Sequence, residues 1–121
     1  MPQEREPRLQ GRRAERRAFW FYRLRGYRIL GTNVWAAGNE LDLVVRRGRR
    51  LVFVEVKSKG GPGYGHPLEM VGPEKQRRLA RAARAFLAAN PELTGLECCF
   101  DVVTVRGADL RRVTGAFEPG W

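Results

Sequence analysis

Histidine and cysteine, which build the commonest transition-metal and redox sites, are scarce in this sequence. Histidine occurs once, at His66, and cysteine occurs twice, at the neighbouring positions Cys98 and Cys99. A zinc site made of cysteine and histidine needs several such ligands, so we expect none here. A disulfide between adjacent cysteines is strained, so we expect two buried free thiols, which suit a reducing cytosol.

Long apolar runs are missing as well. No stretch has the length of a signal peptide or of a transmembrane helix, so we expect a cytoplasmic protein without a membrane partner. The length of 121 residues suits one domain with one core. The polar residues 1–8 include two prolines and predict a flexible N-terminal segment, followed by a single domain over residues 9–121.

Acidic residues are outnumbered by basic ones, 13 against 23, which gives a formal net charge of +10. A charge this high indicates a polyanionic partner, nucleic acid first and an acidic membrane second. Only Lys57, Lys59 and Lys75 are lysines, and the arginines that remain favour bidentate contacts with phosphate. Genome base composition explains the arginine excess equally well. A charge that serves solubility alone is the alternative to nucleic-acid binding.

Residues 39–57 form the part of the chain around which the rest is organised. Two runs rich in β-favouring residues flank the basic turn Gly48-Arg49, which predicts a hairpin. Glycine at the first central position of the turn permits a type II′ geometry. Pairing Arg47 with Arg50 then fixes the register of both strands.

This register places Asp42 opposite Glu55 and Glu40 opposite Lys57. Side chains alternate between the two faces of a strand, so these four are expected on one face. The other face is apolar and reads Leu41, Leu43, Val45, Val52, Val54 and Val56. A loop one residue longer would change the pairing and separate the four charged side chains.

Two carboxylates directly opposite each other repel, so the Asp42–Glu55 pair needs compensation. A divalent cation is the usual one, because Mg²⁺ prefers carboxylate oxygens together with waters and phosphate. With Lys57 two residues beyond Glu55, the pattern predicts a site for phosphodiester hydrolysis. The alternative is a surface hairpin with a weak Glu40–Lys57 ion pair. We favour the site, because residues 52–56 are nearly all apolar, as in a strand covered on both faces.

The remaining elements follow from hydrophobic periodicity and from glycine and proline positions. We expect a helix over residues 9–25 closed by Gly26, a strand over 27–36 with a bulge at Gly31, a glycine-rich loop over 58–72, a helix over 73–89, and strands over 96–106 and 110–117. A strand–helix–strand passage from 51 to 105 predicts a parallel crossover. The expected fold is α/β in the order α-β-β-β-α-β-β, a mixed sheet flanked by helices.

Motifs along the chain resemble those of the YraN-like protein family. They are Gly11-x-x-Ala14-Glu15, Gly26-Tyr27-x-Ile29-Leu30-x-x-Asn33, Glu40-Leu41-Asp42-Leu43, Phe53-Val54-Glu55-Val56-Lys57, Lys75, and Phe100-Asp101-Val102-Val103-x-Val105. The likeness covers nearly the whole chain, and the family is similar to restriction-endonuclease-like and Holliday-junction-resolvase nucleases. The resemblance implies a restriction-endonuclease-like (tRNA-endonuclease-like) core.

The hairpin pattern and the resemblance together predict a metal-dependent endonuclease that acts on nucleic acid, DNA more than RNA, with branched DNA among the substrates considered. Asp42, Glu55 and the Val56 carbonyl oxygen are the expected ligands of Mg²⁺ or Mn²⁺. Lys57 is expected to stabilise negative charge that develops on the water or on the phosphate. The sequence leaves the oligomeric state open, with a homodimer as one option.

Glu40 and Glu15 are expected to assist at this site. For Glu15 the sequence alone leaves an ion pair with a nearby helical arginine open, and only the resemblance favours the site. A non-catalytic nucleic-acid-binding module of the same fold is the alternative function. A protein-interaction scaffold is a third, and no motif supports it.

Basic and aromatic residues outside the hairpin are expected to contact nucleic acid. They are Arg12, Arg16, Lys59, Tyr64, Lys75, Arg77, Arg81 and Arg84. Arg77, Arg81 and Arg84 share one helix face, for which ordinary solvation is the alternative. Tyr64 and His66 lie in the glycine-rich loop, where stacking on a base competes with ordinary loop packing.

Overall fold

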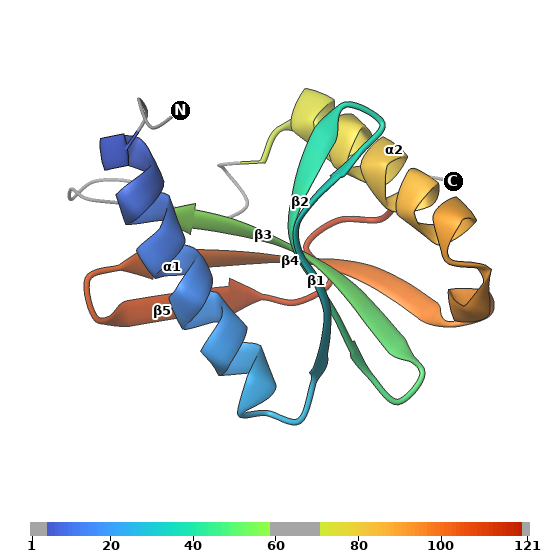
Figure 1. Ribbon diagram of the computed structural model, residues 1–121, viewed down its shortest axis with the longest axis horizontal. Coiled ribbons are helices and arrows are strands. Elements are labelled where there is room, and N and C mark those ends of the chain that lie inside the picture. The colour runs from blue at the N-terminus through green and yellow to red at the C-terminus, as the bar shows by residue number, and fades with distance from the viewer. Residues whose placement is uncertain (1–4, 59–70, 120–121) are drawn as a thin grey trace.

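The computed structural model describes residues 5–58 and 71–119, with the side chains of the first helix described from Arg12 onward. Its elements are α1 (Arg5–Arg23), β1 (Arg28–Ala36), β2 (Asn39–Arg47), β3 (Arg50–Ser58), α2 (Pro73–Ala89), a short 3₁₀ turn η2 (Pro91–Leu93), β4 (Glu97–Arg106) and β5 (Asp109–Val113). The predicted order α-β-β-β-α-β-β is confirmed (Figure 1). In the described part of the chain, no helix has both the length and the hydropathy needed to cross a bilayer.

Several element boundaries differ from the predicted ones. The first helix begins at Arg5 rather than residue 9, because Pro7 lies in its first turn, where a missing N–H costs no helical hydrogen bond. β5 ends at Val113 rather than residue 117, since Gly115 turns the chain with a φ of +56°. The predictions for Lys59, Tyr64 and His66 fall outside the described residues.

The sheet has five strands in the order β1-β2-β3-β4-β5. Neighbouring strands are antiparallel except β3 and β4, which are parallel and joined through α2. The predicted parallel passage is therefore confirmed. The C-terminal end of β3 lies beside α1 (Figure 1).

The two helices cover opposite faces of the sheet. Leu51 and Phe53 of β3 pack into a cluster with α2, whereas Val52 and Val54 pack into a second cluster with α1. The face that α1 turns to the sheet carries small residues, Ala14 and Ala18, followed by the fully buried Tyr22. Small side chains let the helix approach the strands closely.

The β2–β3 hairpin has the predicted register. Arg47 pairs with Arg50, and the backbone ladder continues to Leu43 and Val54. Gly48 has a φ of +62°, and Arg49 is not among the residues of positive φ, as a type II′ turn requires. The hairpin therefore carries Asp42 and Glu55 towards each other.

A kink at Asn33 changes which face the far end of the β1–β2 hairpin presents. Asn33 has a φ of +50° and stands unpaired between the Thr32–Leu43 and Val34–Leu41 pairs. Such a residue interrupts the alternation of side chains along a strand. Leu41 consequently joins the α2 cluster, so the prediction that it shares a face with Leu43 is wrong. The predicted bulge is confirmed, as a register shift between Ile29 and Gly31.

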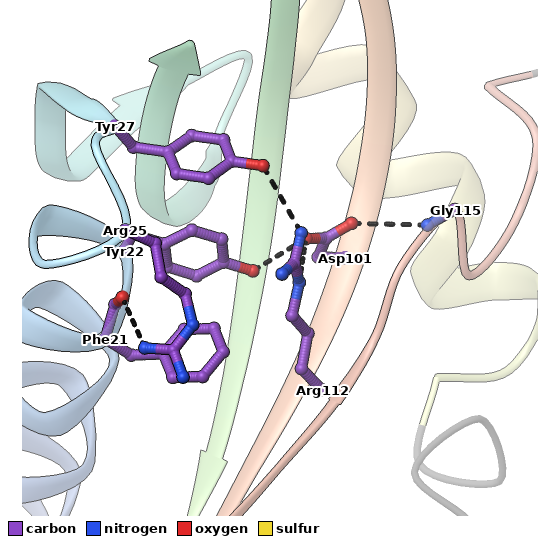
Figure 2. Close-up of polar contacts among 7 residues, drawn as sticks. All are labelled: Phe21, Tyr22, Arg25, Tyr27, Asp101, Arg112 and Gly115. Atoms are coloured by element: carbon purple, nitrogen blue, oxygen red, sulfur yellow. Dashed lines mark hydrogen bonds and ion pairs between the residues drawn. The ribbon is translucent and has the colours of Figure 1, made fainter.

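One fully buried carboxylate, Asp101, ties α1 to β4 and β5 (Figure 2). Its Oδ2 accepts hydrogen bonds from the Tyr22 hydroxyl at 2.7 Å and from Arg112 Nε at 3.1 Å. Its Oδ1 accepts one from the Gly115 backbone N–H at 3.2 Å. Burial and the Asp101 charge raise the pKa of Tyr22, which keeps its hydroxyl protonated as a donor. This network fixes α1 and with it Glu15.

We expect Asp101→Asn to lower the free energy of unfolding by about 2 kcal/mol, the scale of leaving a buried donor without an acceptor. Both carboxylate oxygens of Asp101 accept hydrogen bonds, so the amide group of asparagine would face a donor. Urea unfolding of both proteins measures the difference. Asp109→Asn, at an exposed position on the neighbouring strand, is the matched control. A change no larger than that of the control would contradict the assignment.

Candidate metal and phosphate site

Two buried carboxylates meet where the β2–β3 ladder ends. Asp42 is 9% exposed and Glu55 is 6% exposed. The Val56 backbone N–H donates a 2.8 Å hydrogen bond to Asp42 Oδ2, so the carboxylate takes the place that a strand carbonyl would hold. Asp42 and Glu55 are thus neighbours, as the register predicts, although the backbone pairs described for these strands stop at Leu43–Val54.

The pKa of Asp42 reflects its burial and the carboxylates close to it. Burial raises the pKa of Asp42 to about 8, and the negative charge of Glu55 adds to the shift. Glu15 and Glu40 raise it further, while the Val56 hydrogen bond opposes them. The Asp42 carboxyl therefore retains a proton at neutral pH unless a cation supplies positive charge in its place.

Two lysines offset the other carboxylate. Lys57 Nζ and Lys75 Nζ each lie 3.4 Å from Glu55 Oε2. Lys57 comes from β3 itself, and Lys75 comes from the first turn of α2. The alternative, in which Lys57 forms a surface ion pair with Glu40, is not found among the described residues, because the kink at Asn33 redirects the end of β2 that carries Glu40.

Asn33 organises the other two acidic residues. Its side-chain amide donates to Glu15 Oε1 at 3.0 Å and to Glu40 Oε2 at 2.9 Å. Burial raises the pKa of Glu15, and the hydrogen bond from Asn33 opposes this shift. The charges of Glu40 and Glu55 raise the pKa further, and the charge of Arg12 lowers it with a weaker influence than any of these. The alternative in which Glu15 serves a helical arginine is therefore not favoured. Asn33 belongs to the family-like motif, but no role was predicted for it. The available signal was an asparagine inside a strand, a residue type that tolerates a positive φ.

The donors at this site fit a divalent cation only in part. Among the described residues, no group of three aspartate, glutamate, histidine or cysteine side chains is arranged to hold a metal ion. Asp42 and Glu55 nevertheless form a buried pair of like charge, which a hard cation neutralises. The Val56 carbonyl belongs to the residue whose N–H binds Asp42. Two carboxylates with a main-chain oxygen suit Mg²⁺, which keeps several waters.

Comparison with known proteins identifies the family. The sequence model described as "Uncharacterised protein family UPF0102" matches residues 14–105. The chain belongs to the UPF0102 family. A UPF0102 protein of Syntrophotalea carbinolica is 41% identical over 116 residues, covering 92% of this chain and 94% of its own. One of Chlorobium phaeobacteroides is 39% identical over 117 residues, covering 88% and 92%. One of Alkalilimnicola ehrlichii is 42% identical over 111 residues, covering 91% and 88%. This is the YraN-like family that the motifs resemble.

The UPF0102 match includes the five side chains predicted to be catalytic, which are Glu15, Glu40, Asp42, Glu55 and Lys57. Lys75, predicted as a nucleic-acid contact, also reaches this site through Glu55. The other predicted contacts are dispersed. Arg12 and Arg16 are exposed on α1, and Arg77, Arg81 and Arg84 are exposed on α2, which covers the opposite face of the sheet. Lys59 and Tyr64 lie outside the described residues.

Proposed function

We propose that this UPF0102 protein is a metal-dependent endonuclease that hydrolyses phosphodiester bonds in nucleic acid, with DNA, including branched DNA, as the first substrate to test. One observation carries the proposal. Asp42 and Glu55 form a buried acidic pair, and two half-exposed ammonium groups, Lys57 and Lys75, lie against one of its oxygens. Acidic ligands beside cations match the needs of a phosphate bound together with a divalent ion.

Each residue of the site has a role in this proposal. Asp42, Glu55 and the Val56 carbonyl would hold Mg²⁺ or Mn²⁺, which when bound lowers the pKa of a coordinated water and neutralises phosphate charge. Lys57 presents its ammonium group to the negative charge that grows on the phosphate or on the attacking oxygen. Lys75 holds the Glu55 carboxylate from the side of α2.

Glu15 and Glu40 act indirectly in this proposal. Both accept hydrogen bonds from Asn33, and both raise the pKa of Asp42. They therefore add negative potential around the Asp42–Glu55 pair without occupying it, which strengthens the attraction for a cation. The net charge of +10 supplies the long-range attraction for a nucleic-acid backbone.

The test is cleavage of branched, flapped, single-stranded and duplex DNA in the presence of Mg²⁺ or Mn²⁺. We expect the wild type to cleave at least one substrate, and EDTA and Glu55→Ala each to abolish cleavage. Glu74→Ala is the matched control, because Glu74 is exposed on α2 and pairs only with Arg77 among the described residues. Cleavage of equal rate by Glu55→Ala would indicate a contaminating nuclease and refute the proposal.

A non-catalytic nucleic-acid-binding module is the second candidate. It is favoured by the lack of a third acidic metal ligand among the described residues, and by the two lysines that already offset Glu55. This candidate predicts nucleic-acid binding that is unaffected by EDTA and by Glu55→Ala, with no cleavage of any of the four substrates.

A further inference from the structure

A groove of about 1020 Å³ runs between α1 and the turn that joins β4 to β5. Ala14 and Ser58 line it, and these residues are the chain neighbours of Glu15 and Lys57. The groove lies on the face of the sheet that α1 covers, and it comes closest to the Asp42–Glu55 site at Glu15, whose charge acts on Asp42. Its other lining residues take no part in the proposed chemistry. We call it the α1 groove.

A contact between distant parts of the chain joins the two walls of the α1 groove. Arg17 of α1 donates two hydrogen bonds, both of 2.9 Å, to the carbonyl oxygens of Gly107 and Ala108. These carbonyls belong to the β4–β5 turn, 90 and 91 residues away along the chain. The Asp101 network joins the same helix to β4 and β5. The two walls are therefore fixed relative to each other before any ligand binds.

The lining of the α1 groove combines cations with an exposed aromatic surface. Arg13, Arg16 and Arg106 line it together with Arg17, and no aspartate or glutamate is among the described residues that do. Trp20 is 50% exposed there, although it is one of the largest apolar side chains of the protein. Arg13 and Arg16 make no hydrogen bond or ion pair with any residue that the structure describes. The groove thus offers positive charge and a ring face together.

These features select one kind of ligand. Arginines bind phosphate, and a half-exposed indole ring stacks on a nucleobase whatever its sequence. A base inside a duplex is covered on both faces by its neighbours, so only an unpaired base can stack on Trp20. A ligand with regularly spaced negative charges and free aromatic faces is a single strand of nucleic acid.

We propose that the α1 groove binds single-stranded nucleic acid, with a base stacked on Trp20 and the backbone on Arg13, Arg16 and Arg106. This inference deepens the proposed function, on which it rests, by assigning an unpaired strand next to the scissile site as the substrate class. A flap or a branch contains such a strand beside a duplex. Ser58 lines the groove, so the strand would contact the residue that follows Lys57 in the chain.

The experiment measures binding in EDTA, where no cleavage is required. The probes are a fluorescein-labelled oligothymidylate of about 16 nucleotides and a duplex of equal length. We expect Trp20→Ala to weaken binding of the single strand roughly tenfold and binding of the duplex less than about twofold, because only an unpaired base can stack on the indole ring. Trp20→Phe keeps a ring and should restore most of the affinity.

Trp35→Ala is the matched control, because Trp35 is 69% exposed on β1 and does not line the α1 groove. It should leave both affinities unchanged. Equal losses from Trp20→Ala on single strand and duplex, or equal losses from the two tryptophan variants, would overturn the inference. So would a Trp20-dependent dimer in light scattering, or Trp20-dependent binding to phosphatidylserine vesicles, since either would give the groove a different occupant.

The inference and the proposed function can fail separately. If the wild type cleaves DNA while Trp20→Ala binds the single strand as tightly as the wild type, the groove assignment fails and the nuclease stands. If binding depends on Trp20 but no substrate is cleaved under any metal, the nuclease fails and the groove assignment stands.

Discussion

Glu55→Gln is expected to remove binding of divalent metal while leaving the fold in place. Glutamine has the shape of glutamate but no charge, and the proposed ligand set contains only one other carboxylate, Asp42. Glu55 lies in β3, and its backbone pairs with Val102 of the parallel strand β4, a contact that the substitution does not alter. Loss of metal binding without unfolding would therefore isolate the role of the charge.

The stability of this variant follows from two opposing changes. Removing the Glu55 charge relieves its repulsion with Asp42. It also removes the partner of Lys57 and Lys75, but these side chains are 31% and 38% exposed and can be hydrated instead. We expect the midpoint of thermal unfolding to stay within a few degrees of the wild type or to rise.

Isothermal titration with Mn²⁺ and urea unfolding measure the two outcomes. Glu74→Gln is the control, because it removes one negative charge from an exposed position and should leave Mn²⁺ binding unchanged. Undiminished Mn²⁺ binding by Glu55→Gln would show that the Asp42–Glu55 pair is not the metal site.

The free energy of unfolding of the metal-free wild type should also depend on pH, because of Asp42. Burial and Glu55 raise the pKa of Asp42 from 3.8 to about 8 in the folded protein. A raised carboxyl pKa means that the folded state holds the proton longer, so this group's contribution to stability is lost as pH rises from about 4 to 8. Glu55→Gln removes one cause of the shift, so its stability should fall less steeply over the same range.

The register of the central hairpin was predictable because a local feature sets it. Gly48 and Arg49 fix a tight turn, and each pair between Arg47–Arg50 and Leu43–Val54 follows from it. The approach of Asp42 to Glu55 is a consequence of the same short-range geometry. The order of elements and the start of α2 at Pro73 were likewise readable from local glycine and proline positions.

Contacts that depend on one backbone angle or on distant partners were not predictable. The partner of Lys57 and the face of Leu41 both changed because Asn33 adopts a φ of +50°, which a strand pattern does not reveal. The hydrogen bond from Tyr22 to Asp101 spans 79 residues. Nothing local in the sequence marks that pair, so the anchoring of α1 emerged only from the fold.

Lys57→Ala is expected to lower turnover by roughly a hundredfold, the scale of losing one preorganised contact to a transition state. Lys57 Nζ lies 3.4 Å from Glu55 Oε2 and its side chain is 31% exposed, so the ammonium group borders the acidic pair and also faces solvent. From there it can attract charge that develops on the phosphate or on the attacking oxygen without binding the metal. Metal binding should stay near that of the wild type, or become tighter, because a neighbouring positive charge is gone. Substrate affinity should change little, since many arginines share the attraction.

Lys75→Ala is the matched control, because its ammonium group lies at the same 3.4 Å from the same oxygen but comes from α2. If Lys75 only offsets the charge of Glu55, its loss should lower turnover by less than about tenfold, so the two variants differ in kcat while sharing the loss of one ion pair. Single-turnover cleavage at saturating protein separates the chemical step from binding. Should Lys57→Ala cleave at the wild-type rate, Lys57 is merely an ion-pair partner of Glu55. Equal large losses in both variants would instead assign the effect to the position of the Glu55 carboxylate, which both lysines hold.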